Sequence, residues 1–72
     1  MDTNSFMNEL AYILETSADK ISMKNDLNKF ESWDSLAMMT FVVVFRDKVE
    51  KEVDPMKVSK CLKVLDSYDI VK

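Results

Sequence analysis

Apolar residues recur at helical spacing near the start of the chain. Four of them fall on one face of a helix: Phe6, Leu10, Ile13 and Leu14. This spacing predicts a first helix that ends at about Glu15 or Ser17. Thr3, Asn4 or Ser5 is expected to serve as its N-cap, because short polar side chains accept a hydrogen bond from the free N–H groups of the first turn.

The next segment, residues 18–33, shows no sustained period and is rich in polar side chains, which predicts a long loop. Loops of this length are uncommon in compact domains unless they are functional or anchored. Four apolar side chains are the expected anchors: Ile21, Met23, Leu27 and Phe30.

A strongly apolar stretch follows and predicts a second helix that begins at Ser35 and continues through Phe45 into the charged residues up to Glu52. The run of valines at 42–44 would also suit a strand. The total length and the mixed-charge tail favour the helix, as does the helical spacing of the apolar residues.

Two further helices are predicted in the last third of the chain. Asp54-Pro55 is a helix-start signal, since aspartate caps well and proline suits the first helical position. A short helix through Met56, Val58, Ser59 and Cys61 should follow. Val64, Tyr68 and Val71 then lie at helical spacing and predict a last helix from Val64 to Val71. The pattern therefore predicts an all-α fold of four helices, with a long first loop and a short third helix, in one domain over residues 1–72.

Composition narrows the classes of function. A chain of 72 residues has no room for a cleft between two domains. The net charge is -3 and the basic residues are scattered, which argues against nucleic acid as a partner. Cys61 is the only cysteine and there is no histidine, so we expect neither a disulfide nor a zinc site, and Cys61 is interpreted as a small core residue.

The chain shows no sign of a membrane segment. Its longest apolar stretch, residues 36–45, is far shorter than the roughly 20 residues that cross a bilayer. No basic segment precedes an apolar one at the N-terminus, which argues against a signal peptide. We therefore expect a cytoplasmic protein.

The tetrapeptide Trp33-Asp34-Ser35-Leu36 puts a hydroxyl where a polar loop meets an apolar helix. Ser35 would be a poor nucleophile, because no histidine is present to take its proton, so we do not expect an enzyme. As an N-cap it would contribute about 0.5–2 kcal/mol. Asp34 is able to cap the same helix, which would leave the hydroxyl free for another use. The residues alone leave both the cap and an attachment point open.

Asp34-Ser35-Leu36, after an anchored loop and before an apolar helix, resembles the attachment motif of acyl carrier proteins. The similarity continues without a gap through the expected second, third and fourth helices and covers nearly the whole chain. It implies a four-helix bundle of the acyl carrier protein type. It also implies that a separate phosphopantetheinyl transferase attaches 4'-phosphopantetheine to Ser35, with Asp34 assisting by approaching the transferase's metal ion.

The resemblance also implies partners. The thiol of the arm would hold acyl or aminoacyl groups as thioesters and present them to acyl-loading and acyl-transfer enzymes, and the carrier would be a monomer. Trp33 resembles carriers of specialised pathways more than housekeeping fatty-acid carriers. Fatty-acid, polyketide and nonribosomal peptide synthesis all remain open, as does transfer to a cell-envelope sugar or polymer.

In that family the second helix meets partner enzymes through acidic residues, and this chain departs from the pattern. The corresponding positions hold Ala37, Thr40, Arg46, Asp47 and Lys48, so Asp47 is the one carboxylate in the middle of the helix. Docking is therefore expected to rest more on apolar contacts, which we assign to Leu36, Met39 and Val43. Core packing is the alternative role of Met39 and Val43.

Two further possibilities concern the interior and the class of protein. Carriers of this family can hide a short acyl chain between their helices. Met38, Met39 and Met56 alongside Phe41 and Phe45 could give a pliable interior for it, and ordinary core packing is the alternative role of these residues. The rival class is a small helical adaptor that binds partner helices through the same apolar residues of the second helix, with Ser35 as a cap only.

Overall fold

The computed structural model describes residues 1–72 and contains four α-helices, two short 3-10 turns and no strand. In chain order the elements are α1 (Thr3–Ile13), η1 (Ala18–Lys20), η2 (Leu27–Lys29), α2 (Ser35–Val49), α3 (Pro55–Ser59) and α4 (Val64–Val71). The predicted all-α class is confirmed, and α4 has the predicted bounds. None of the helices combines the length and the apolar character that a membrane crossing requires.

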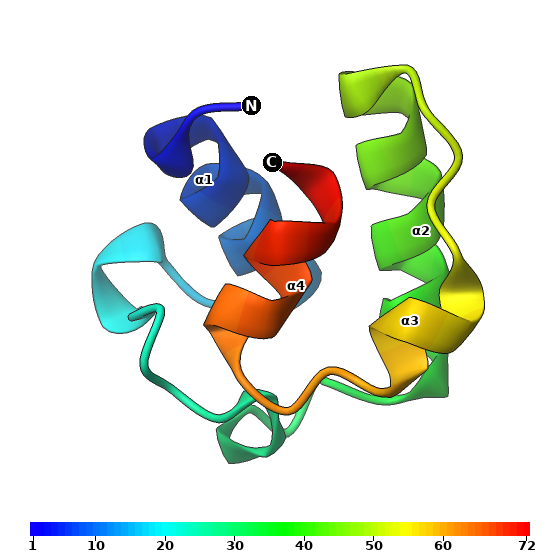
Figure 1. Ribbon diagram of the computed structural model, residues 1–72. Helices are drawn as coiled ribbons and strands as arrows, with labels where there is room; N and C mark the ends of the chain where they lie inside the picture. The colour runs from blue at the N-terminus through cyan, green and yellow to red at the C-terminus, as the bar shows by residue number, and fades with distance from the viewer.

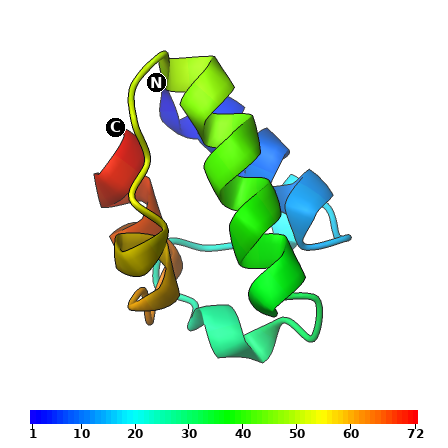
Figure 2. The same cartoon turned by 90° about the vertical axis from the view of Figure 1, so that its right-hand side faces the viewer.

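The longest helix, α2, forms one side of the molecule (Figure 1). After α2 the chain turns back and runs alongside it to α3, as both ribbon views show (Figures 1 and 2). The two termini lie near one end of the molecule. The start of α2 lies at the opposite end, beside the loop that contains η2.

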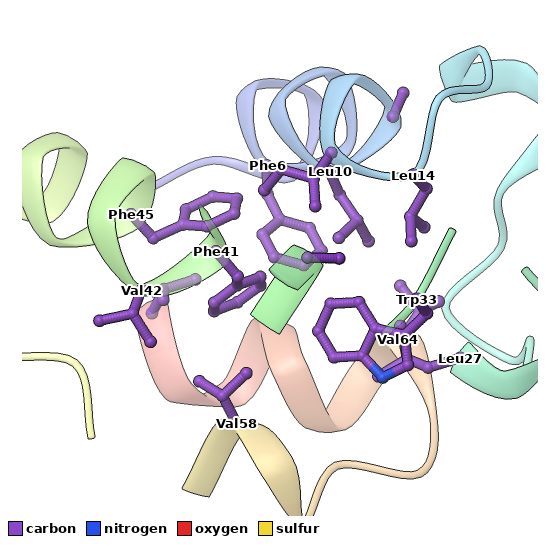
Figure 3. Close-up of a cluster of buried hydrophobic side chains, with 14 of the residues drawn as sticks. Phe6, Leu10, Leu14, Leu27, Trp33, Phe41, Val42, Phe45, Val58 and Val64 are labelled. Carbon is purple, nitrogen blue, oxygen red and sulfur yellow. The ribbon is translucent and has the colours of Figure 1, made fainter. Parts of the chain in front are cut away.

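The core is a single cluster of 16 buried apolar residues to which all four helices contribute. Its centre holds the rings of Phe6, Phe41 and Phe45 (Figure 3). The centroid of the Phe45 ring lies 4.4 Å from that of Phe41 and 5.3 Å from that of Phe6. Val58 of α3 lies across these rings from α1, and Val64 of α4 lies beside Trp33 and Leu27. Burial of such apolar area is the main favourable term in folding a domain of this size.

The loop between α1 and α2 is pinned by three backbone hydrogen bonds to the link before α4 and to the first two residues of α4. The N–H of Leu27 donates to the carbonyl of Leu62 at 2.8 Å, and the N–H of Val64 donates to the carbonyl of Asn25 at 2.9 Å. The N–H of Leu65 completes the set by donating to the carbonyl of Met23 at 3.1 Å. The expected anchors are therefore confirmed: Ile21 and Leu27 are buried, and Met23 and Phe30 are half-buried against the core.

The start of α1 differs from the prediction. Its N-cap is Asp2, whose Oδ1 accepts a hydrogen bond from the N–H of Ser5 at 2.8 Å. Thr3, Asn4 and Ser5, the three expected candidates, lie inside the first turn instead. That turn is exposed, so a pattern of apolar residues that begins at Phe6 carries no information on where the helix starts.

The ends of the first three helices come earlier than predicted. The α1 helix ends at Ile13, two residues before Glu15, which has a left-handed backbone with φ of 57°. The α2 helix ends at Val49 rather than near Glu52, because Glu50 has a left-handed backbone with φ of 55°. This turn lets Val53 reach the core. The α3 helix stops at Ser59, so Cys61 lies outside it and is half-buried rather than a core residue.

Candidate functional site

The N-cap of α2 is Asp34. Its Oδ1 accepts a hydrogen bond from the N–H of Ala37 at 2.9 Å, and its backbone is extended, as a cap requires. Ser35 is the first residue within the helix and is exposed. Its hydroxyl makes no hydrogen bond within the chain, since the cap position is taken. The cap of α2 is therefore Asp34 and not Ser35.

The turn that presents Ser35 is held by the core. The ring of Trp33 is buried and packs edge-on against Phe41, with centroids 6.2 Å apart. The N–H of Trp33 donates to the carbonyl of Phe30 at 3.0 Å. One residue earlier, the hydroxyl of Ser32 donates to the Oε2 of Glu15 at 2.8 Å, which ties the turn to the end of α1. Ser35 therefore projects from a well-anchored backbone.

A shallow apolar hollow of about 260 Å³ lies beside Ser35, where α3 packs against the first half of α2. It is lined by Ser35, Met38, Met39, Pro55, Met56 and Ser59. The hydroxyl of Ser59 donates to the carbonyl of Met56 at 2.8 Å, so Ser35 contributes the one unbonded hydroxyl of the hollow.

The hollow corrects the expected interior. Met39 and Met56 are exposed and line the surface hollow, whereas the half-buried Met38 lines the hollow and also packs against the core. Phe41 and Phe45 are fully buried and do not line it. The reason is the rotational position of α2, which turns its aromatic residues inward and leaves Met39 on the outside.

The apolar residues predicted on the outer face of α2 do lie there. Leu36, Met39 and Val43 are 76%, 55% and 47% exposed, which rules out core packing for Met39 and Val43. Their spacing places them in one stripe along the helix, and the exposed Asp47 comes one turn after Val43. We call Leu36, Met39 and Val43 the α2 stripe.

Two of the positions that correspond to the family's acidic face are not available to a partner. Ala37 is buried, so it takes no part in the outer surface. The Nζ of Lys48 lies 3.2 Å from the Oε1 of Glu9, which joins the end of α2 to α1. Asp47 is in no ion pair. The carboxylate of α2 is therefore free for an external partner.

Part of the site was missed from the sequence. Pro55 and Ser59 line the hollow beside Ser35, yet the Asp54-Pro55 signal predicts only that a helix starts there. No local sequence pattern predicts which element the five-residue helix α3 packs against. The contact between α3 and α2 depends on burial of Val58 and Val53, which is a property of the whole core.

None of the side chains with a shifted pKa lines the hollow beside Ser35. Burial, with a smaller contribution from the negative charge of Asp66, raises the pKa of the Cys61 thiol to about 11. Its Sγ lies 3.3 Å from the carbonyl oxygen of Lys57, which accepts its hydrogen bond. The thiol is therefore protonated and unreactive at neutral pH. No three side chains of the metal-binding types come close enough together to hold a metal ion.

Comparisons of the chain with protein-family models, with curated proteins and with solved structures find no match.

Proposed function

We propose that the protein is an acyl carrier protein in which Ser35 is the attachment site of 4'-phosphopantetheine. One observation carries the proposal. The Ser35 hydroxyl is exposed and unbonded in the first turn of α2, while the neighbouring Asp34 supplies the cap. A serine needed only for stability would make the capping bond itself.

The surroundings of the hydroxyl suit a phosphodiester. The backbone N–H groups of Ser35 and Leu36 have no acceptor within the chain, and they lie at the positive end of the α2 dipole. A phosphate on the Ser35 oxygen would meet both the dipole and these donors. The residues present therefore fit the group, whose terminal thiol supplies thioester chemistry when it is attached.

Asp34 is suited to a second role during the modification. Its Oδ1 accepts the capping bond, and its Oδ2 accepts no hydrogen bond within the chain. The free oxygen is available to the metal ion of a transferase without loss of the cap. The Ser35 hydroxyl would lose its proton to a base of that enzyme and form the new P–O bond, with release of the nucleotide half of coenzyme A.

Partner enzymes would dock on the α2 stripe. Leu36 adjoins the attachment site, and Met39 and Val43 extend the exposed apolar surface along the same helix. Asp47 is the one carboxylate of α2, so charge steering by this helix is weak. Docking should therefore depend little on ionic strength, since screening acts on charges and leaves apolar contacts.

The decisive experiment is an intact-mass measurement after incubation with coenzyme A, Mg²⁺ and a broad-specificity phosphopantetheinyl transferase. A gain of about 340 Da is expected from the formula of the group. Ser35→Ala should abolish the gain. Ser59→Ala, at a serine that lines the same hollow, is the matched control and should keep it. An unmodified wild-type protein, or a gain that survives Ser35→Ala, would refute the proposal.

The exposed α2 stripe also suits the second candidate function, a helical adaptor that receives a partner helix. The two functions differ in their need for Ser35. An adaptor with Ser35→Ala should bind its partner as tightly as the wild type does. A carrier with the same substitution should lose all transfer of acyl groups while keeping its fold.

A further inference from the structure

The interior of the fold has no space for an acyl chain. The rings of Phe6, Phe41 and Phe45 fill its centre, and all three side chains are fully buried (Figure 3). The structure has five hollows, each open to solvent, and none is lined by any of these rings. Close-packed interiors of this kind admit a new group only if side chains move apart.

Two hollows adjoin the attachment region, and neither encloses a long chain. The apolar one between α2 and α3 has a volume of about 260 Å³, which is below the range of about 300–1,000 Å³ of pockets that bury small-molecule ligands. The other, of about 210 Å³, lies between α1 and α2, and Glu15 and Asp34 are part of its lining. Their carboxylates would lose hydration against an alkyl chain, so this second hollow is unsuitable.

We infer, on the basis that Ser35 carries the arm, that the acyl group stays outside the helices and that this protein carries short or polar acyl groups rather than long aliphatic chains. Each methylene of a long chain left in water is unfavourable, and only a short segment of chain fits against the methionines of the α2–α3 hollow. A small or polar group needs no such shelter. The packing of the core therefore selects the class of cargo.

Trp33 gives the inference a direct reporter. It is the only tryptophan of the chain, it is buried, and it packs against Phe41 close to the attachment site. A chain that entered the core past Phe41 would change the surroundings of the indole ring. A group that stays on the surface would leave them unchanged.

The test loads the wild-type protein with butanoyl-phosphopantetheine or dodecanoyl-phosphopantetheine from the corresponding coenzyme A thioesters. Loading is checked by intact mass before each measurement. The two forms should melt within about 1 °C of each other and share one Trp33 emission maximum. A ligand that binds the native interior raises the melting temperature. A dodecanoyl form that melts several degrees higher, with a shifted Trp33 emission, would overturn the inference.

A core variant tests the physical reason. Phe41→Leu replaces a ring at the centre of the core with a smaller side chain and opens space there. The dodecanoyl form of this variant should therefore melt above its butanoyl form. Phe45→Leu is the second variant, used if the first fails to fold. Val43→Ala, at an exposed position of the same helix, is the matched control and should show no dependence on chain length. A folded core variant that still ignores chain length would contradict the role given to packing.

The two proposals fail in different ways. If no mass gain occurs, the proposed function fails before any cargo is compared. If the mass gain occurs at Ser35 but the wild type is stabilised by the longer chain, the carrier function stands and only the inference about its cargo is wrong.

Discussion

Substitution of Asp34 should destabilise the fold, whereas substitution of its neighbour Ser35 should leave the stability almost unchanged. Asp34→Ala removes the oxygen that accepts the N–H of Ala37 at 2.9 Å. Loss of such a cap costs about 0.5–2 kcal/mol. Loss of a negative charge at the helix start adds about 0.3–1 kcal/mol. Ser35→Ala breaks no hydrogen bond and replaces an exposed residue with a better helix former, so unfolding free energy should change by less than about 0.5 kcal/mol.

These values are large enough to measure. For a domain of this size, each 1 kcal/mol corresponds to about 4–8 °C in melting temperature. Urea unfolding followed by far-ultraviolet circular dichroism and by Trp33 fluorescence gives the free energies, and coincident transitions verify two-state behaviour. Asp34→Asn is the matched control for charge, because asparagine caps a helix about as well as aspartate does.

Two results would refute the reasoning. A Ser35→Ala variant that is destabilised by about 0.5–2 kcal/mol, as expected for loss of an N-cap, would mean that Ser35 and not Asp34 caps the helix. An Asp34→Ala variant as stable as the wild type would mean the same. If Asp34→Asn loses only the charge contribution of about 0.3–1 kcal/mol but is modified more slowly by the transferase, the carboxylate has the second role proposed for it.

Three further predictions concern the backbone and the ionisable groups. Glu50→Gly should raise the unfolding free energy by about 0.5–1 kcal/mol, since glycine adopts a left-handed backbone without strain. Glu52→Gly is the control and should not raise it. Equal effects of the two substitutions in urea unfolding would contradict this prediction. Burial raises the pKa of the Cys61 thiol to about 11, so its thiolate at neutral pH should be about 100-fold scarcer in the folded protein than in the unfolded chain. Alkylation of Cys61, followed by mass spectrometry, should therefore be correspondingly slower without urea than with it. Similar rates in the two conditions would refute the burial of the thiol. Hydrogen bonds from the N–H groups of Lys63 and Leu62 hold the pKa of Asp66 below its ordinary value of 3.8. The stabilising effect of the ionised Asp66 carboxylate should be complete above pH 3.8 and be lost as the pH falls through the lowered pKa. Asp66→Asn should lack this pH-dependent loss of stability.

The sequence predicted most of the elements because their signals are local. Asp54-Pro55 marks the start of α3, and the side chain of Asp54 accepts the N–H of Met56 at 2.9 Å as a cap does. The spacing of Val64, Tyr68 and Val71 predicts the bounds of α4. Boundaries that depend on exposed or left-handed residues were predicted less well. Neither Asp2 as a cap nor the left-handed Glu50 leaves a mark in the apolar pattern.

The site was predictable as a set of residues but not as an arrangement. Leu36, Met39 and Val43 share a helix face by their spacing, so their common stripe follows from the sequence. Whether that stripe faces the core or solvent depends on which other residues of α2 pack best against α1 and α3. Phe41 and Phe45 take the inward positions, and this leaves Met39 and Val43 outside.

The sequence by itself determined that a hydroxyl and a carboxylate stand side by side at the start of an apolar helix. The tertiary structure decided which of them is used to hold that helix. The buried Trp33 packs against Phe41 just before this turn, the backbone is still extended at Asp34 and becomes helical at Ser35, and the cap position therefore belongs to the aspartate. Capping is a local interaction, but which residue makes it depends on where the chain leaves the core, and here the first residue after the buried Trp33 makes it and the hydroxyl of Ser35 stays free.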